Sequence, residues 1–308
     1  AFLEDASDSG MSAQMEGYSG AEVAGGVRSA ASFALARSAM ASESERNAGI
    51  VTTDDLREAI KEVRPALGKQ DDVLHMRYPQ GISLCSPGIV RIARDLQRFT
   101  APVPSDAPRL ESLLLVGAGG KGGAGVTALA AWAAANASAK NQADYVRFIT
   151  SLDILTGEGN GGDETRATAL VDRFAEARES QTSLLVLDDV DQLCAGSGSS
   201  GYSSVLLSTL RALVRHPPSS ESTATAGCQS NPKTGAKGKS LHVIATTSRS
   251  DAACLVLHEI FDETLVVPLL STKEEVSQLF AECSLSEVVA DKDSLADMII
   301  NRIGSVGC

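Results

Sequence analysis

A glycine-rich segment near the middle of the chain has the residue types and spacing of a phosphate-binding loop. It follows a short apolar run that ends at Gly117, and it precedes an alanine-rich helical pattern. Glycines here allow backbone N–H groups to turn towards an anion, and the first turn of a helix adds positive potential. We expect nucleotide phosphates to be bound by Gly120, Lys121, Gly122, Gly123, Ala124, Gly125, Val126 and Thr127.

One position of this loop departs from the usual motif, because Val126 stands where a lysine bridges the outer phosphates. A hydrogen bond to a charged group contributes about 1.5–3 kcal/mol, so its loss corresponds to about tenfold to hundredfold weaker binding. Lys121 is an alternative source of the charge. The run from Lys121 to Thr127 is similar to the variant loop of partition ATPases. Those proteins also keep the lysine that Val126 replaces here. Thr127 retains a hydroxyl suited to magnesium.

A second candidate feature is an acidic pair that follows the apolar run 184–187. Such a run predicts a strand buried on both faces, and open parallel sheets bind ligands at the carboxyl ends of their strands. We expect Asp188 to hold magnesium through water. Asp189 is then placed to orient or deprotonate an attacking water.

A third feature is a polar ending to the apolar run 241–246. We expect this strand to lie between the strands that precede the loop and the acidic pair. Thr247 is then a candidate to bind the attacking water or the terminal phosphate, and its alternative interpretation is an ordinary β-branched strand end. Arg249 is interpreted as a surface charge.

These candidates need a scaffold of strands that alternate with helices, which predicts an α/β fold with a parallel sheet flanked by helices. Strands are predicted at 113–116, 145–149, 184–187, 241–246 and 264–267. Helices are predicted at 127–139, 165–180 and 203–215, with further helices beginning near Thr272 and Ser294.

Composition divides the chain into four parts. Residues 1–68 contain two helix patterns, at 19–40 and 52–64, typical of a helical subdomain whose partner lies upstream of residue 1. The other parts are a linker at 69–108 with one helix at 89–99, a core at 109–270 with a flexible insertion at 217–240, and a truncated helical lid at 271–308.

Charge and composition exclude several classes of protein. The net charge of −12 argues against a general nucleic-acid binder. Six scattered cysteines without zinc spacing indicate reduced thiols in a cytoplasmic protein, and a buried Cys194 is the favoured interpretation of the thiol beside the acidic strand. No stretch approaches the roughly 20 apolar residues of a membrane span.

Several segments together resemble the vesicle-fusing AAA+ ATPases, the N-ethylmaleimide-sensitive factor family. The segments 17–22 and 51–68 are similar to the end of that family's first ATPase module, which implies a residual helical lid at 1–68. The segments 127–131, 186–193 and 245–251 are similar to its second module. The double aspartate and the Thr-Thr-Ser-Arg sequence are the more specific parts of the resemblance.

The resemblance implies an AAA+ P-loop fold, a magnesium-ATP ligand and a homohexamer. It also implies SNARE complexes as the substrate, reached through soluble adaptor proteins, in a cytoplasmic protein recruited peripherally to membranes. In that family the second module mainly holds the hexamer together and hydrolyses ATP slowly. Gly125, Thr127, Asp188, Asp189 and Thr247 match its phosphate loop, acidic strand and sensor strand.

Departures from the family leave two alternatives open beside an ATP-binding assembly module. The loop carries about three extra residues and lacks its lysine, the segment 199–202 lacks an expected basic residue, and the insertion at 217–240 is long. One alternative is a catalytically dead scaffold without nucleotide. The other is a different P-loop switch that uses Lys121 as an intersubunit phosphate contact.

Overall fold

The computed structural model describes residues 20–40, 50–62, 71–102, 107–118, 124–155, 162–196, 201–218, 238–249, 255–282, 295–298 and 300. The chain separates into two compact units, Ala1–Lys69 and Gln70–Cys308. Each unit has its own packing.

The first unit contains two helices, α2 (Gly20–Met40) and α3 (Thr53–Glu62), which pack against each other. Small side chains make the contact, because Ala30, Ala34 and Ala59 are all fully or almost fully buried. Both helices occur where the helical spacing of apolar residues predicts them.

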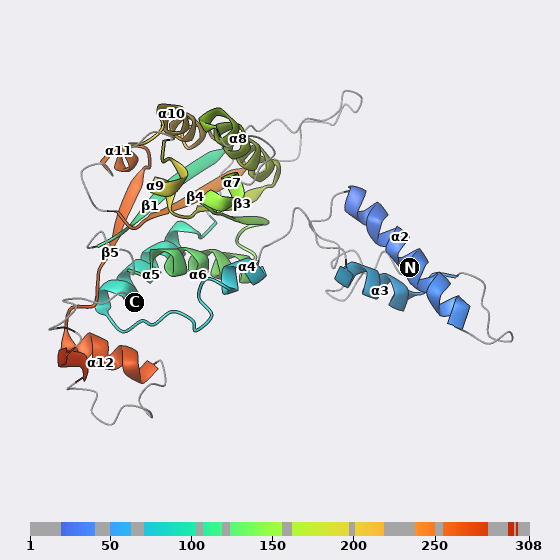
Figure 1. The fold of residues 1–308 in the computed structure, drawn as a ribbon, viewed down its shortest axis with the longest axis horizontal. Helices are drawn as coiled ribbons and strands as arrows, with labels where there is room; N and C mark the ends of the chain where they lie inside the picture. The colour runs from blue at the N-terminus through green and yellow to red at the C-terminus, as the bar shows by residue number, and fades with distance from the viewer. Residues whose placement is uncertain are drawn as a thin grey trace. The chain divides into compact units, whose positions relative to one another are not determined.

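The second unit is built on a five-stranded parallel sheet in the order β2-β3-β4-β1-β5 (Figure 1). All five strands occur where apolar runs predict them, and the strand that ends at Thr247 does lie between the other two that carry the candidate site. The strands are β1 (Arg109–Gly117), β2 (Tyr145–Ile149), β3 (Thr182–Leu187), β4 (Ser240–Thr247) and β5 (Glu263–Val267).

Helices cover both faces of this sheet, which confirms the α/β class (Figure 1). On one face lie α4 (Asp71–His75), α5 (Pro87–Phe99) and α6 (Val126–Ala139), and on the other lie α8 (Asp163–Glu179), α10 (Ser204–Leu213) and α11 (Leu255–His258). The remaining helices are α7 (Ser151–Leu155), α9 (Val190–Leu193) and α12 (Lys273–Glu282), and residues 295–298 are also helical.

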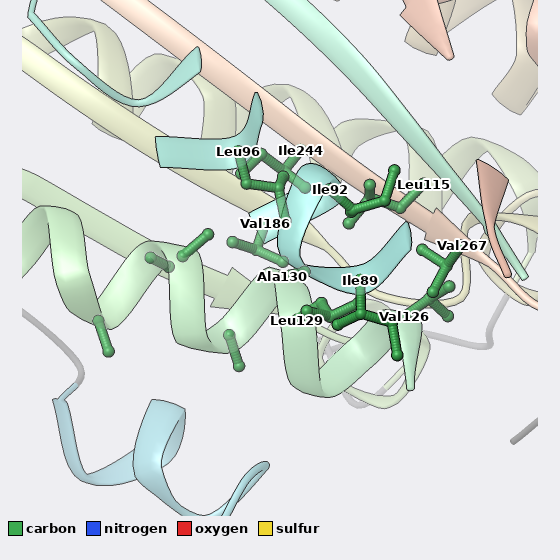
Figure 2. Close-up of a cluster of buried hydrophobic side chains, with 14 of the residues drawn as sticks. Ile89, Ile92, Leu96, Leu115, Val126, Leu129, Ala130, Val186, Ile244 and Val267 are labelled. Atoms are coloured by element: carbon green, nitrogen blue, oxygen red, sulfur yellow. The ribbon is translucent and has the colours of Figure 1, made fainter. Parts of the chain in front are cut away.

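The main apolar cluster lies between the sheet and α6 (Figure 2). Helix α6 contacts β1, β2, β3 and β4, and it also contacts α4 and α5. A helix enclosed in this way must be apolar nearly all round. Alanines satisfy that requirement and allow close approach, and buried alanines occur in α6 at 130, 131, 133, 134, 135 and 137.

Helix α5 begins two residues before the predicted start at Ile89. The Ser86 hydroxyl accepts a hydrogen bond from the Gly88 N–H at 3.2 Å, and Pro87 occupies the first turn, where its missing N–H costs nothing. Its apolar side chains, including Ile92 and Leu96, join the cluster beneath the sheet.

Strand β5 is fastened to β1 by a pair of residues that are distant in the sequence. The Asp262 carboxylate accepts hydrogen bonds from the Ser112 hydroxyl at 2.7 Å and from the Ser112 N–H at 3.1 Å. The Asp262 N–H donates back to the Ser112 hydroxyl at 3.0 Å. Because Ser112 is buried, its polar atoms need these partners.

We expect Asp262→Ala to lower the free energy of unfolding by about 1–2 kcal/mol, since buried Ser112 loses its acceptor. Urea unfolding followed by the fluorescence of Trp132, the single tryptophan, measures this. Glu263→Ala, an exposed neighbour, is the control and should change stability by about 0.5 kcal/mol or less. Equal stabilities of the two variants would contradict a fastening role for Asp262.

Candidate active site

The candidate site lies at the carboxyl edge of the sheet, where β1, β3 and β4 end beside one another. The register pairs Leu187 with Ala245, so the residues that follow on β3 and β4 emerge together. Helix α6 begins at the same edge, after the chain leaves β1. Parallel strands therefore bring the predicted loop, acidic pair and polar strand end into one region.

Asp188 is the centre of this region. Its Oδ1 accepts a hydrogen bond from the Thr127 hydroxyl at 2.7 Å and another from the Thr246 hydroxyl at 2.8 Å. Its backbone N–H donates to the Ile149 carbonyl at 2.8 Å, which fixes it against the end of β2. The side chain is almost fully buried, so the two hydroxyls compensate its lost hydration.

These oxygens suit a magnesium ion better than they suit a softer metal. Magnesium takes carboxylate and hydroxyl oxygens and keeps several waters. Thr127 and Asp188 already meet, so one ion near both would replace a single hydrogen bond. The role of these two residues as metal ligands stays a prediction.

The end of the glycine-rich loop has the backbone geometry of a tight turn into a helix. Gly125 has a φ of 75°, in the left-handed region, and it precedes the first residue of α6. A Cβ at Gly117 would lie 3.1 Å from the Ala124 Cβ, so the chain returns closely past the end of β1. Of the predicted loop, Gly120, Lys121, Gly122 and Gly123 lie outside the described residues.

Val126 is buried in the apolar cluster, close to Ile89, Leu129 and Val267 (Figure 2). Its side chain therefore contributes to packing, and only its backbone N–H, in the first turn of α6, is left to contact an anion. The start of α6 presents no side-chain cation at this position. The electropositive part of the described loop is its backbone.

Asp189 has a left-handed backbone conformation and a raised side-chain pKa. Its φ of 50° is left-handed, and its N–H donates to the Thr246 hydroxyl at 2.9 Å. Burial raises the pKa of the Asp189 carboxyl, and the charges of Asp188 and Asp191 raise it further, while Arg77 lowers it. A raised pKa favours proton uptake from water, which suits the base role predicted for this residue.

Thr247 is fully buried and engaged on the other side of the acidic turn. Its hydroxyl donates to Asp191 Oδ1 at 2.9 Å and accepts from the Arg249 N–H at 3.2 Å. The structure therefore does not bring Thr247 to Asp188. The adjacent Thr246 makes that contact, and the catalytic role of Thr247 stays a prediction.

Sequence reasoning missed two residues of this site, Thr246 and Asp191. Adjacent strand residues point to opposite faces, so only one of two consecutive threonines can meet Asp188. The signal that could have found Asp191 is its place two residues after the acidic pair, in the first turn of α9.

The family model described as "ATPase family associated with various cellular activities (AAA)" matches residues 114–269, the part that holds this site. The chain belongs to this AAA family. The match confirms the predicted AAA fold class.

Curated AAA relatives cover most of the chain. The chain is 27% identical to "Vesicle-fusing ATPase" of Dictyostelium discoideum, over 89% of the chain and 35% of that protein. It is 28% identical to "Vesicular-fusion protein sec18" of Schizosaccharomyces pombe, over 91% of the chain and 32% of that protein. It is 28% identical to "Vesicle-fusing ATPase" of Arabidopsis thaliana, over 95% of the chain and 37% of that protein. The chain spans about a third of the length of these relatives, and the predicted resemblance is confirmed.

Within the parts of the AAA chain that the structure describes, helices long and apolar enough to cross a bilayer are absent. Cys194, just after the acidic turn, is fully buried. Burial raises the pKa of its thiol to about 12, with nearby Asp191 adding to the shift and Arg166 opposing it. The thiol is therefore protonated at neutral pH and shielded from solvent, as the favoured interpretation of the sequence predicts.

We expect iodoacetamide at pH 8 to leave Cys194 unmodified in the folded chain and to modify it in urea, since alkylation needs an accessible thiolate. Peptide mass spectrometry locates the label. Cys85 is a second buried thiol and should behave alike, because burial also raises its pKa. Modification of folded Cys194 at the rate seen in urea would contradict the packing of the acidic turn.

Proposed function

We propose that the second unit is an ATP-binding AAA module that uses magnesium and mainly supports assembly of a homohexamer, with slow hydrolysis. The observation that carries the proposal is the meeting of Thr127 and Asp188 at 2.7 Å beside the first turn of α6. That arrangement joins a magnesium site to a backbone anion site. A nucleotide triphosphate with its metal fits both.

The weak-hydrolysis part of the proposal rests on Val126. A phosphate loop without its lysine has lost a charge-assisted contact to the outer phosphates. Asp189, with its raised pKa, remains available as the base for water. We therefore assign Asp189 and Thr247 to the hydrolytic step and expect that step to be slow.

We further propose that the longer protein belongs to the vesicle-fusing type and disassembles SNARE complexes through soluble adaptors. The names of its vesicle-fusing relatives support this proposal, and so does the similarity over most of the chain. In that protein, residues 1–68 are the residual lid of a preceding AAA module. Residues 69–108 connect that module to the P-loop core at 109–270 and add α4 and α5 to its packing, and 271–308 are the start of a second lid. Recruitment to membranes is then through partners, from the cytoplasm.

A second candidate function is a nucleotide-free AAA scaffold. Burial of Val126 favours it, because the position that normally carries the phosphate-binding cation has become part of the apolar core. The two functions differ in whether ATP binds.

Equilibrium titration with Mg-ATP tests the proposal, with the parent chain compared with Val126→Lys and with Val126→Met as the uncharged control of similar length. We expect the parent to bind in the micromolar range, and Val126→Lys to bind about tenfold to hundredfold more tightly once it is shown to be folded. Binding by the lysine variant alone would establish the scaffold. The molar mass, measured by light scattering, should rise to that of a hexamer with Mg-ATP, and a monomer under both conditions would contradict assembly by this chain.

A further inference from the structure

Arg77 is held close to the candidate site by a segment whose backbone is fixed. It lies two residues after the end of α4, and its N–H donates to the Leu74 carbonyl at 3.0 Å. Leu74 is fully buried in the cluster that contains α6, and α4 packs against α6 (Figure 1). The backbone of Arg77 is therefore anchored on the same face of the sheet as α6, while its side chain is exposed.

The guanidinium of Arg77 lies over an aromatic ring near the carboxyl end of β2. Its Cζ is 5.1 Å from the centre of the Phe148 ring, within the range of a cation–π contact. Phe148 pairs with Val186, two residues before Asp188, and the next residue of β2 accepts the Asp188 N–H. Arg77 therefore lies at the sheet edge that carries the acidic pair.

Among the residues that the structure describes at this edge, carboxylates outnumber cations. Three carboxylates, Asp188, Asp189 and Asp191, lie within one turn, while Val126 brings no cation from α6. The Arg77 guanidinium, over the Phe148 ring, brings a positive charge to this end of β2. Among the described residues the Arg77 guanidinium has no carboxylate within ion-pair distance, so its five N–H donors remain available to an anion.

We propose that Arg77 contacts the terminal phosphate of the bound nucleotide and supplies the positive charge that position 126 lacks. This inference rests on the proposed binding of Mg-ATP. Arginine suits the task, since its planar fork binds phosphate oxygens in pairs and stacks on aromatic rings. The Phe148 ring holds the guanidinium on the α6 face of β2, and the exposed side chain has the freedom to move towards a phosphate next to Asp188.

The place of Arg77 at the end of β2, next to the strand that leads into Asp189, makes the contact specific for the triphosphate. Asp189 is the predicted base for the attacking water, so the group next to it is the terminal phosphate. A diphosphate has no group there. Loss of Arg77 should therefore weaken binding of Mg-ATP much more than binding of Mg-ADP.

The test is calorimetric titration of the full chain with Mg-ATP and with Mg-ADP, for the parent, Arg77→Ala, Arg77→Gln and Arg77→Lys. Arg91→Ala is the matched control, an exposed arginine on α5. We expect Arg77→Ala and Arg77→Gln to weaken Mg-ATP binding about tenfold or more. Mg-ADP binding should change by about twofold or less, as for a distant surface charge. Arg77→Lys should fall between, because it keeps the charge and loses the fork.

Two results would overturn the inference while the proposed function survives. One is Mg-ATP binding by Arg77→Ala and Arg77→Gln that equals that of Arg91→Ala. The other is an equal loss for Mg-ATP and Mg-ADP, which would assign Arg77 a general electrostatic or packing role. A parent chain that binds neither nucleotide would overturn both the inference and the proposed function. Unchanged melting temperatures of the Arg77 variants exclude misfolding as the cause.

Discussion

Asp188 accepts hydrogen bonds from hydroxyls on two different elements, Thr127 at the start of α6 and Thr246 at the end of β4. A carboxylate buried this deeply needs donors, because it has lost most of its water. Both donors reach it only if β4 lies next to β3 and if α6 starts above the same edge. The hydrogen bonds of the buried Asp188 carboxylate therefore depend on the strand order, on the tight turn at Gly125 and on the packing of α6.

The same arrangement explains how the edge can attract a nucleotide without the motif lysine at position 126. Asp188, Asp189 and Asp191 concentrate negative charge, and a divalent cation is the natural counter-charge for such a group. A metal-bound triphosphate would bring that cation with it. The backbone amides of the first turn of α6 and the guanidinium of Arg77 then face the phosphate oxygens, while Val126 strengthens the core beneath them.

Local sequence patterns were sufficient for much of the fold. The run Tyr145–Ile149 is wholly occupied by a strand, because both of its faces are covered and its side chains suit burial. The helix that begins near Thr127 is also local, since alanine favours helices and allows burial all round. The short helices α4, α7, α9 and α11 were not predicted, because elements of four or five residues leave too little periodicity to detect.

The side-chain contacts of the site were harder to predict from the sequence, because they depend on the register between neighbouring strands. Asp188 and Thr127 were predicted to share an ion and do lie together, although the ion itself stays a prediction. Which of Thr246 and Thr247 faces Asp188 is decided by the alignment of β4 with β3, and a shift of one residue would exchange them. Arg77 lies far from the motif in sequence, and only the packing of α4 on α6 brings it near.

The central claim is that Thr127 and Asp188 form a magnesium site that serves a bound nucleotide. ATP affinity measured with and without Mg²⁺ tests it most directly, in the parent, in Thr127→Val, which removes the hydroxyl at equal size, and in Thr127→Ser, which keeps it. The account predicts that Mg²⁺ strengthens ATP binding about tenfold or more in the parent and in Thr127→Ser. That gain should be largely lost in Thr127→Val, with metal-free binding unchanged. An equal gain from Mg²⁺ in Thr127→Val would contradict the claim.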